Sequence, residues 1–269
     1  MCYKRQVNAQ ARFRIRDLAK VRVGIKTCAD EVYIRTDWQA IPPEKRPEPH
    51  LLHCLLSHDD AARWTTRTPQ EQRRQIVYTH EMRAGKRKAI DLTKYPGAAA
   101  YFEMYRTRLE SREYVLRAGR QWFEIWVPQQ PDAWRLPKLL FPDISAEPKF
   151  FFDDHGCMVD GNCYWITMDA NHDPDILFLI QGLANSNLMT RYHDLSFNNR
   201  LYAGRRRYLT QYVEKYPIPD PDLADSRHVI SLAKELVFGS LPKEVQMQKE
   251  REIEVTVASL FGVDAVLRL

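Results

Sequence analysis

Four short apolar runs in the middle of the chain limit the folds it can adopt. The runs are WFEIWV (residues 122–127), KLLF (138–141), KFFF (149–152) and CYWITM (163–168), and Pro, Asp and Gly residues lie between them. Runs of this length that are rich in aromatic and β-branched residues and bounded by turn residues predict strands. The segment HGCMVDGN, residues 155–162, predicts a hairpin that joins the last two strands.

Helices are expected mainly after these strands. Asp173-Pro174 predicts the start of a helix through ILFLIQGLANSNLMTRY, and further helical patterns cover residues 207–214, about 222–237 and 242–261. Strands followed by helices predict an α+β fold rather than alternating βαβ units. We expect short antiparallel or mixed strands in a small sheet with packed helices, and a helical C-terminal part.

The clearest helix lies before the strand runs. It opens at Pro96 and ends at Gly119. Its helically spaced apolar positions predict a buried stripe, made of Tyr101, Met104, Tyr105, Leu109 and Leu116.

The N-terminal third shows weaker patterns. Residues 15–34 predict strand, glycine turn and strand, residues 41–50 form a proline-rich connector, and LLHCLL is either a strand or half a helix. The charged stretch 68–92 predicts an exposed helix that fades at Gly85. The predicted organisation is a domain over residues 1–221, with a helical excursion at about 40–95, and a C-terminal helical extension over 222–269.

Composition points to a cytoplasmic protein. No apolar run reaches the about 18 residues of a membrane helix, and the first residues lack the apolar stretch of a signal peptide. The five cysteines form no regular framework and are interpreted as reduced thiols. Residues 1–125 hold 25 basic and 15 acidic residues, whereas the remainder holds 15 and 20. A basic half suits a polyanion partner, although a solvated surface explains it equally well.

Known catalytic motifs are scarce. The chain contains no GxGxxG, no GxxxxGK[ST] and no GxSxG motif. His155, Cys157 and Cys163 lack the CxxC spacing of a zinc knuckle, so packing roles are favoured over a metal site.

One stretch, PDISAEPK, has the residue types of a magnesium-dependent nuclease. Asp143, Glu147 and Lys149 would then hold Mg²⁺ and polarise water. Only three residues separate Asp143 from Glu147, which leaves no room for the second strand of such a site, and Pro148 would interrupt it. Chance composition is the better explanation.

Several stretches together resemble one family. Between residues 16 and 263 the chain contains, in this order, LAKVRVGIKTCADEVYI, YPGAAAYFEMYRTRLESREY with QWFEIWVP, KLLFPDISAEPKFFFDDHG, LIQGLANSNLMTRYH, GRRRYLTQYVEKYPIPDP and IEVTVASLFGV. Together they resemble the TaqI-like specificity (target-recognition) domain of type II and IIG adenine-N6 DNA methyltransferases, which belong to restriction-modification systems. The resemblance is weaker over residues 40–92.

The resemblance implies a partner and a missing activity. In that family this region binds double-stranded DNA and reads its sequence, while a separate domain binds S-adenosylmethionine and methylates a flipped adenine. The family's (N/D)PP(Y/F) tetrapeptide does not occur, and the single PP lies in IPPE, residues 41–44. We therefore expect no catalysis and no cofactor in this chain alone. It resembles the C-terminal piece of a longer enzyme, or a recognition subunit that works with a methyltransferase catalytic domain or subunit.

Two turns are candidate DNA contacts. Lys26 and Thr27 follow Gly24 in a tight turn that offers an ammonium, a hydroxyl and backbone N–H groups to a phosphate or a groove edge. Asn162 lies at the predicted hairpin tip, and Lys138 lies at the start of a predicted strand. The alternatives are a plain turn with its lysine in water, and a tip that only reverses the chain.

The arginine-rich segment supplies the other candidates. Arg206 and Arg207 are expected at the start of an exit helix, with Arg200 on the loop before it. Asn198 and Asn199 carry amides suited to adenine edges, or serve only turn geometry. Two rival functions stay open: a nuclease that uses Asp143, and a protein-interaction module whose basic half binds an acidic partner.

Overall fold

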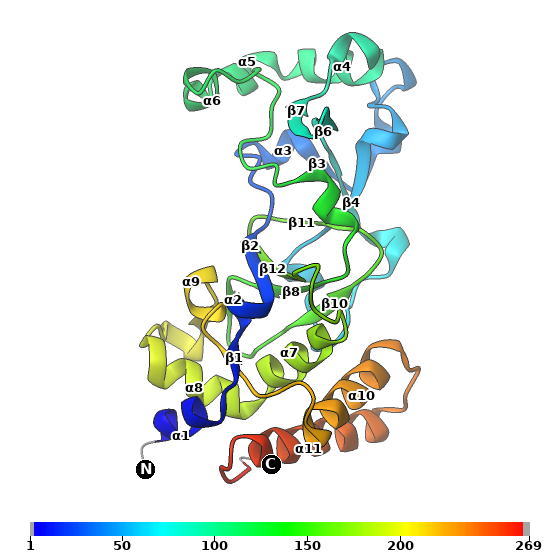
Figure 1. The fold of residues 1–269 in the computed structure, drawn as a ribbon. Helices are drawn as coiled ribbons and strands as arrows, with labels where there is room; N and C mark the ends of the chain where they lie inside the picture. Colours follow the sequence, from blue (N-terminus) through cyan, green and yellow to red (C-terminus); the bar gives the residue numbers. More distant parts are fainter. Residues whose placement is uncertain (1–2, 266–269) are drawn as a thin grey trace.

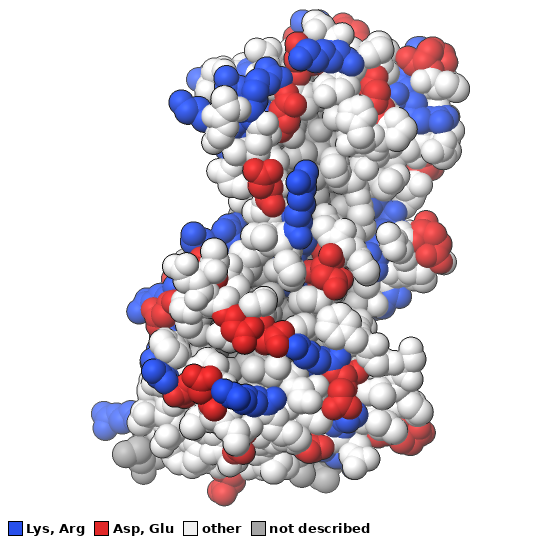
Figure 2. Space-filling view, turned by 45° about the vertical axis from the view of Figure 1, so that its right-hand side comes forward, with Lys and Arg blue, Asp and Glu red and all other residues white. Residues whose placement is uncertain are grey.

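The computed structural model describes residues 3–265 and confirms the predicted α+β fold. Figure 1 shows an elongated molecule whose central sheet lies between an upper part, built from the green-blue segments, and a lower part, rich in helices, that holds both ends of the described chain. Figure 2 shows a narrowing between the two parts, with basic and acidic side chains mixed over the face in view. The positive charge of the chain is therefore not concentrated on that face.

The central sheet has four antiparallel strands in the order β10-β8-β12-β2. Its strands are β2 (Ala19–Val23), β8 (Lys138–Pro142), β10 (Phe151–Asp153) and β12 (Cys163–Met168). Leu139 of β8 belongs to the lower hydrophobic core, whereas the next residue, Leu140, belongs to the upper one. Because successive side chains of a strand point to opposite faces, the sheet separates the two cores and both of its faces are apolar. The predictions for KLLF, KFFF and CYWITM are confirmed as strands.

Helices cover the lower face of this sheet. They are α1 (Tyr3–Gln10), α2 (Ile15–Leu18), α7 (Ile176–Asn185), α8 (Asn187–Phe197), α9 (Thr210–Val213), α10 (Ala224–Phe238) and α11 (Lys243–Leu260), with a small ladder of β1 (Phe13–Arg14) and β14 (Pro217–Ile218). The two predicted closing helices are confirmed. The single helix predicted after Pro174 is wrong, because Ser186 interrupts it and caps α8 by accepting a hydrogen bond from the Met189 amide.

The upper part holds a second four-stranded sheet, in the order β11-β4-β5-β3, and a separate hairpin. The strands are β3 (Ile34–Arg35), β4 (Leu52–Leu56), β5 (Arg74–Val77) and β11 (Met158–Val159), and the hairpin is β6 (His80–Arg83) with β7 (Lys86–Ala89). LLHCLL is therefore a strand. Of the strand, turn and strand predicted over residues 15–34, the first strand forms as β2 after the short helix α2. The second strand is wrong, because Asp30–Tyr33 form the helix α3 and only Ile34 enters β3.

The helix predicted over residues 68–92 is wrong. The segment forms strands, and residues 40–72 contribute only short 3₁₀ turns besides β4, so the excursion is not helical. The hairpin turns at Ala84 and Gly85, whose φ angles are 51° and 71°. Two successive residues with positive φ form the turn that best matches the twist of a two-residue hairpin. The charges of this segment lie on an exposed hairpin rather than on an exposed helix.

The helix predicted from Pro96 to Gly119 is also interrupted. It forms α4 (Pro96–Met104), α5 (Arg106–Glu110) and α6 (Glu113–Arg117), and Gly119 ends it with a φ of 72°. Tyr101 and Leu109 are buried as predicted, but Met104 and Leu116 are 46% and 42% exposed. The breaks rotate the later turns, so one continuous stripe does not form.

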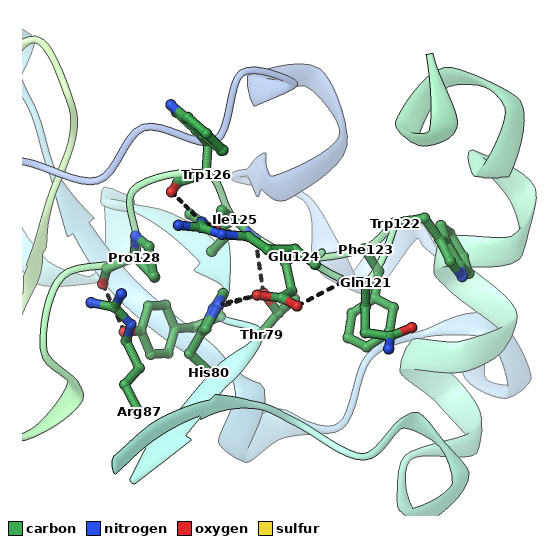
Figure 3. A network of polar contacts seen from close by, with 12 residues as sticks. Thr79, His80, Arg87, Gln121, Trp122, Phe123, Glu124, Ile125, Trp126 and Pro128 are labelled. Atoms are coloured by element: carbon green, nitrogen blue, oxygen red, sulfur yellow. Dashed lines mark hydrogen bonds and ion pairs between the residues drawn. The ribbon is translucent and has the colours of Figure 1, made fainter. Parts of the chain in front are cut away.

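Residues 122–127 were predicted as a strand and are irregular instead. Val127 alone pairs with another backbone segment, in an isolated antiparallel bridge to Lys26. Side chains bind carbonyls of the other residues: Arg120 donates to those of Ile125 and Trp126, and Tyr33 donates to that of Phe123. Figure 3 shows the polar contacts around Glu124, whose carboxylate lies 3.1 Å from the His80 imidazole. Burial lowers the pKa of His80, which favours the neutral ring in this site.

The hairpin predicted at HGCMVDGN is wrong as well. Its centre forms β11, which pairs in parallel with β4, and β10 and β12 both flank β8 instead of pairing with each other. This pairing brings Cys54 and Cys157 together in a disulfide with a Cα–Cα distance of 4.8 Å. The prediction of reduced thiols is therefore wrong for these two residues, since 103 positions separate them and sequence spacing alone does not reveal the pair. No helix within residues 3–265 combines the length and the apolar character needed to cross a bilayer.

Candidate nucleic-acid interface

The Gly24–Thr27 turn and the Asp160–Asn162 turn lie against each other at the end of the central sheet. The Ile25 amide donates to the Val159 carbonyl at 2.6 Å, and the Gly24 amide donates to the Cys163 carbonyl at 2.9 Å. A Cβ atom on Gly24 would lie 2.1 Å from the Asp160 carbonyl oxygen, and one on Gly161 would lie 2.6 Å from that of Ile25. Both glycines are therefore needed for this close approach.

These turns form a cleft of about 430 Å³, named here the lysine cleft. It is lined by Ile25, Lys26, Thr27, Cys28, Ala29, Asp30, Glu31, Asp160, Gly161 and Asn162. The structure thus brings together three sequence-predicted residues. Lys26 is exposed, and Asn162 is half-buried with its side-chain oxygen accepting from the His58 amide at 3.2 Å. Thr27 is 1% exposed and precedes α3, where its hydroxyl donates to Asp30 and accepts from the Ala29 amide. Thr27 therefore shapes the turn and is not on the surface.

The second group of residues is the segment Asn198–Arg207, named here the arginine loop. Arg206 and Arg207 form the short strand β13, which pairs with β9 (Ile144–Ser145), so the predicted helix over residues 207–214 is reduced to α9. Because neighbouring strand residues point to opposite sides, the two arginines have different roles.

Arg206 points inward. Its guanidinium binds the Asp194 carboxylate at 2.6 and 2.9 Å and the Ala146 carbonyl at 2.8 Å, and its side chain is 12% exposed. Arg200 binds the same carboxylate. The ion pair with Asp194 raises the pKa of Arg206. Arg206 and Asp194 therefore anchor the arginine loop, and the prediction that Arg206 contacts DNA is not supported by its position.

Arg207 points outward and is 45% exposed, with its guanidinium 3.0 Å from the Asp143 carboxylate. The Asn199 amide donates to the Arg207 carbonyl at 2.6 Å, and Asn198 ends α8 in the left-handed conformation with φ 43°. Asn199 is thus a structural residue, while Asn198 is exposed. The Asp143 amide donates to the Asn162 carbonyl at 2.9 Å, so Asp143, through its ion pair with Arg207, connects the arginine loop to the lysine cleft.

A buried histidine supports the arginine loop from below. His193 of α8 is fully buried and lies 2.8 Å from the Tyr216 hydroxyl through its Nδ1 atom. Burial lowers its pKa to about 4, so the ring is neutral near pH 7. The loop is therefore built on a packed base rather than on solvent.

Lys138 was predicted to contact DNA and is completely buried. Its ammonium lies 2.8 Å from the Asp153 carboxylate and donates to the Trp134 carbonyl at 2.8 Å. Lys138 lies on the same face of β8 as Leu140, two residues on, so its side chain enters the upper core and not a groove. The DNA-contact prediction for Lys138 is wrong in this structure.

The proposed nuclease residues do not form a shared metal site. Asp143 is engaged by Arg207, Glu147 is exposed, and within residues 3–265 no three His, Cys, Asp or Glu side chains gather as a ligand set. Of the possible zinc ligands, Cys157 is bonded to Cys54, and Cys163 is buried in β12.

Two important residues were missed by the sequence analysis. Arg112 is 2% exposed and donates to the Thr27 carbonyl behind the lysine cleft at 2.8 Å. Tyr202 lies in the arginine loop and is 83% exposed, beside Ala203 and Gly204 with φ angles of 56° and 68°. The AG pair after Tyr202 was the available signal for a turn with an exposed ring. No sequence signal identifies Arg112 as buried.

Comparisons with known proteins place this geometry in context. No family model matches the chain. The chain is 49% identical over 260 residues to the type II methyltransferase M.BanIII of Aneurinibacillus aneurinilyticus, which covers 96% of this chain and 44% of that protein. It is 25% identical over 246 residues to the type II methyltransferase M.BstVI of Geobacillus stearothermophilus, over 88% of this chain and 40% of that protein.

A third relative shows the same partial coverage. The type II methyltransferase M.XhoI of Xanthomonas vasicola is 24% identical over 203 residues, which are 74% of this chain and 34% of that protein. The chain spans less than half the length of the curated relatives it matches. It is therefore a homologue of one segment of type II methyltransferases.

Proposed function

We propose that this chain is the double-stranded DNA target-recognition part, of the TaqI-like kind, of an adenine-specific methyltransferase in a restriction-modification system. The observation that carries the proposal is the junction of the lysine cleft and the arginine loop through the Asn162–Asp143 hydrogen bond. This junction brings the exposed Lys26, the exposed Arg207 and the Asn162 side chain onto neighbouring segments of a homologue of type II methyltransferases.

The exposed groups match the chemistry of duplex DNA. Lys26 supplies a phosphate contact, and Arg207 can exchange its exposed ion pair with Asp143 for a phosphate, because such surface pairs contribute little stability, about 0 to 1 kcal/mol. Asn162 and Asn198 carry the amides that suit base edges. Arg200, Arg206 and Asn199 position the loop. Methyl transfer and S-adenosylmethionine binding are assigned to a catalytic domain or subunit outside these 269 residues, since the (N/D)PP(Y/F) motif is absent here.

Substitutions in the lysine cleft test this assignment. Lys26→Ala is expected to weaken binding to all duplex sequences and to make the slope of log K against log salt shallower by about one. Asn162→Ala is expected to reduce the preference among duplex sequences, by about 1 to 3 kcal/mol for the base it reads. Fluorescence anisotropy with labelled duplexes at several salt concentrations measures both effects.

Lys86→Ala is the matched control, because it removes one positive charge from the exposed β6–β7 hairpin. It should leave the sequence preference and the salt slope unchanged. If Lys26→Ala and Lys86→Ala behave alike, the lysine cleft does not contact DNA.

A further inference from the structure

A second cleft, on the helical end of the molecule, gathers positive charge. It has a volume of about 480 Å³ and lies among α1, the β1–α2 junction, α8 and the residues after α9, which Figure 1 shows together at the lower left. Its lining is Lys4, Asn8, Arg14, Arg16, Tyr192, Ser196, Phe197 and Lys215, with four basic side chains and no acidic one. It is named here the basic cleft.

The four cations are poorly neutralised. Within residues 3–265, Lys4 and Lys215 have no ion-pair partner, and the only pair of Arg16 joins it to the exposed Asp17 at 3.9 Å. Arg14 donates to neutral oxygens, the Asn8 side chain at 3.0 Å and the Lys215 carbonyl at 3.5 Å. Like charges at short range repel each other, so this arrangement favours a bound anion.

The neutral groups of the cleft are also arranged as donors. The Asn8 side-chain oxygen accepts from Arg14 and from the Tyr192 hydroxyl at 2.9 Å, which leaves its NH₂ group for a ligand. The buried Ser196 hydroxyl has no hydrogen-bond partner among the described residues. Asp17 lies outside the lining and accepts from the Arg14 backbone amide at 2.7 Å. A site with cations, free donors and no lining carboxylate suits phosphate oxygens.

We propose that the basic cleft binds phosphates of the DNA backbone, at a position separate from the lysine cleft. Phe197 of the basic cleft directly precedes Asn198, so α8 carries one site on its side and the arginine loop at its end. The exposed Arg16 and Lys215 leave the cleft open to a continuous polyanion strand rather than only to a small ion. This inference rests on the proposed DNA-recognition function and adds a second point of backbone contact to it.

The test compares two double variants of the full chain. Lys4→Ala with Lys215→Ala removes two charges from the basic cleft, and Lys86→Ala with Lys88→Ala removes two from the exposed β7 strand. The cleft variant is expected to bind every duplex sequence more weakly, by a similar factor for each sequence, so that the sequence preference is unchanged. Its slope of log K against log salt should become shallower by about two, one for each lysine removed. The β7 variant should keep the parental slope. Circular dichroism melting checks that both variants fold, and Lys215→Glu is the single-site replacement if the double cleft variant does not.

Binding of inorganic phosphate, compared with binding of the duplex, shows whether the basic cleft binds DNA backbone phosphates or a free anion. Loss of slope in the cleft variant, with the parental slope kept in the β7 variant, supports the proposal. Stabilisation of the parental chain by inorganic phosphate, lost in the cleft variant while the duplex slope is unchanged, identifies a free-anion site and overturns it. An unchanged slope without a phosphate effect also overturns it, but leaves the proposed function standing. Absence of duplex binding by the parental chain defeats both.

Discussion

Arg112→Met is expected to lower the free energy of unfolding by about 3 to 5 kcal/mol, because hydrogen bonds to a buried charged group are strong and their loss leaves acceptors unsatisfied. The Arg112 guanidinium donates to the carbonyls of Thr27, Trp122 and Glu124 at 2.8, 2.6 and 3.1 Å. It also donates to the Tyr33 hydroxyl at 3.0 Å. One side chain thus holds the lysine cleft, the irregular 122–127 segment and α3 together.

Urea unfolding followed by tryptophan fluorescence measures this loss. Arg108→Met is the matched control, since Arg108 lies in α5, four residues before Arg112, and pairs with Glu31 on the surface at 2.7 Å. Exposed pairs of this kind contribute below about 1 kcal/mol. Arg112→Lys should recover only part of the loss, because an ammonium does not reproduce the planar fork of donors. Equal stability of Arg112→Met and Arg108→Met would show that the network does not hold the fold.

Lys138→Met is expected to cost about 3 to 5 kcal/mol of folding free energy, because it leaves a buried carboxylate without its charge partner. The side chains of Lys138 and Asp153 are 0% and 2% exposed. Burial lowers the pKa of Lys138, while Asp153 opposes this shift by stabilising the charged form. The pair bridges β8 and β10 at the edge of the central sheet, where the two residues are directly opposite.

A double substitution separates the pair from the packing around it. Lys138→Met with Asp153→Leu removes both charges and is expected to be more stable than Lys138→Met alone. The double variant should still be less stable than the parental chain, because Asp153 also accepts from the Cys157 amide at 3.2 Å and Lys138 donates to the Trp134 carbonyl. Thermal and urea melts of the three proteins measure the difference. If the double variant were less stable than Lys138→Met, the unpaired Asp153 carboxylate would not be the cause of the lost stability.

The elements that sequence predicts well are those with strong local patterns. β8, β10 and β12 follow from apolar runs between turn residues, and α10 and α11 from helical spacing. The helix predicted over residues 68–92 was wrong because the charges of this segment suit an exposed helix and an exposed hairpin equally. Its turn uses Ala84-Gly85 rather than the Asn-Gly or Asp-Gly pair that marks such hairpins.

Site residues were predictable from the sequence only where they lie in a glycine-containing turn. Lys26 and Asn162 meet because the Gly24 and Gly161 turns do, and both glycines were visible in the sequence. The inward position of Arg206 depends on β9, about 60 residues earlier, and on Asp194 of α8. The burial of Lys138 depends on Asp153 across the sheet. Such long-range partners decide whether a basic residue is a ligand contact or an anchor, and residue type alone does not reveal them.

The affinity of this chain for duplex DNA, measured as a function of salt concentration, tests the central proposal most directly. A target-recognition part that holds backbone phosphates must show log K falling linearly with log salt, by about 0.9 for each phosphate neutralised. Lys26, Arg207 and the basic cleft together predict a slope steeper than about −2. A chain that binds no duplex at low salt, or binds it with an affinity that salt does not change, would contradict the proposal.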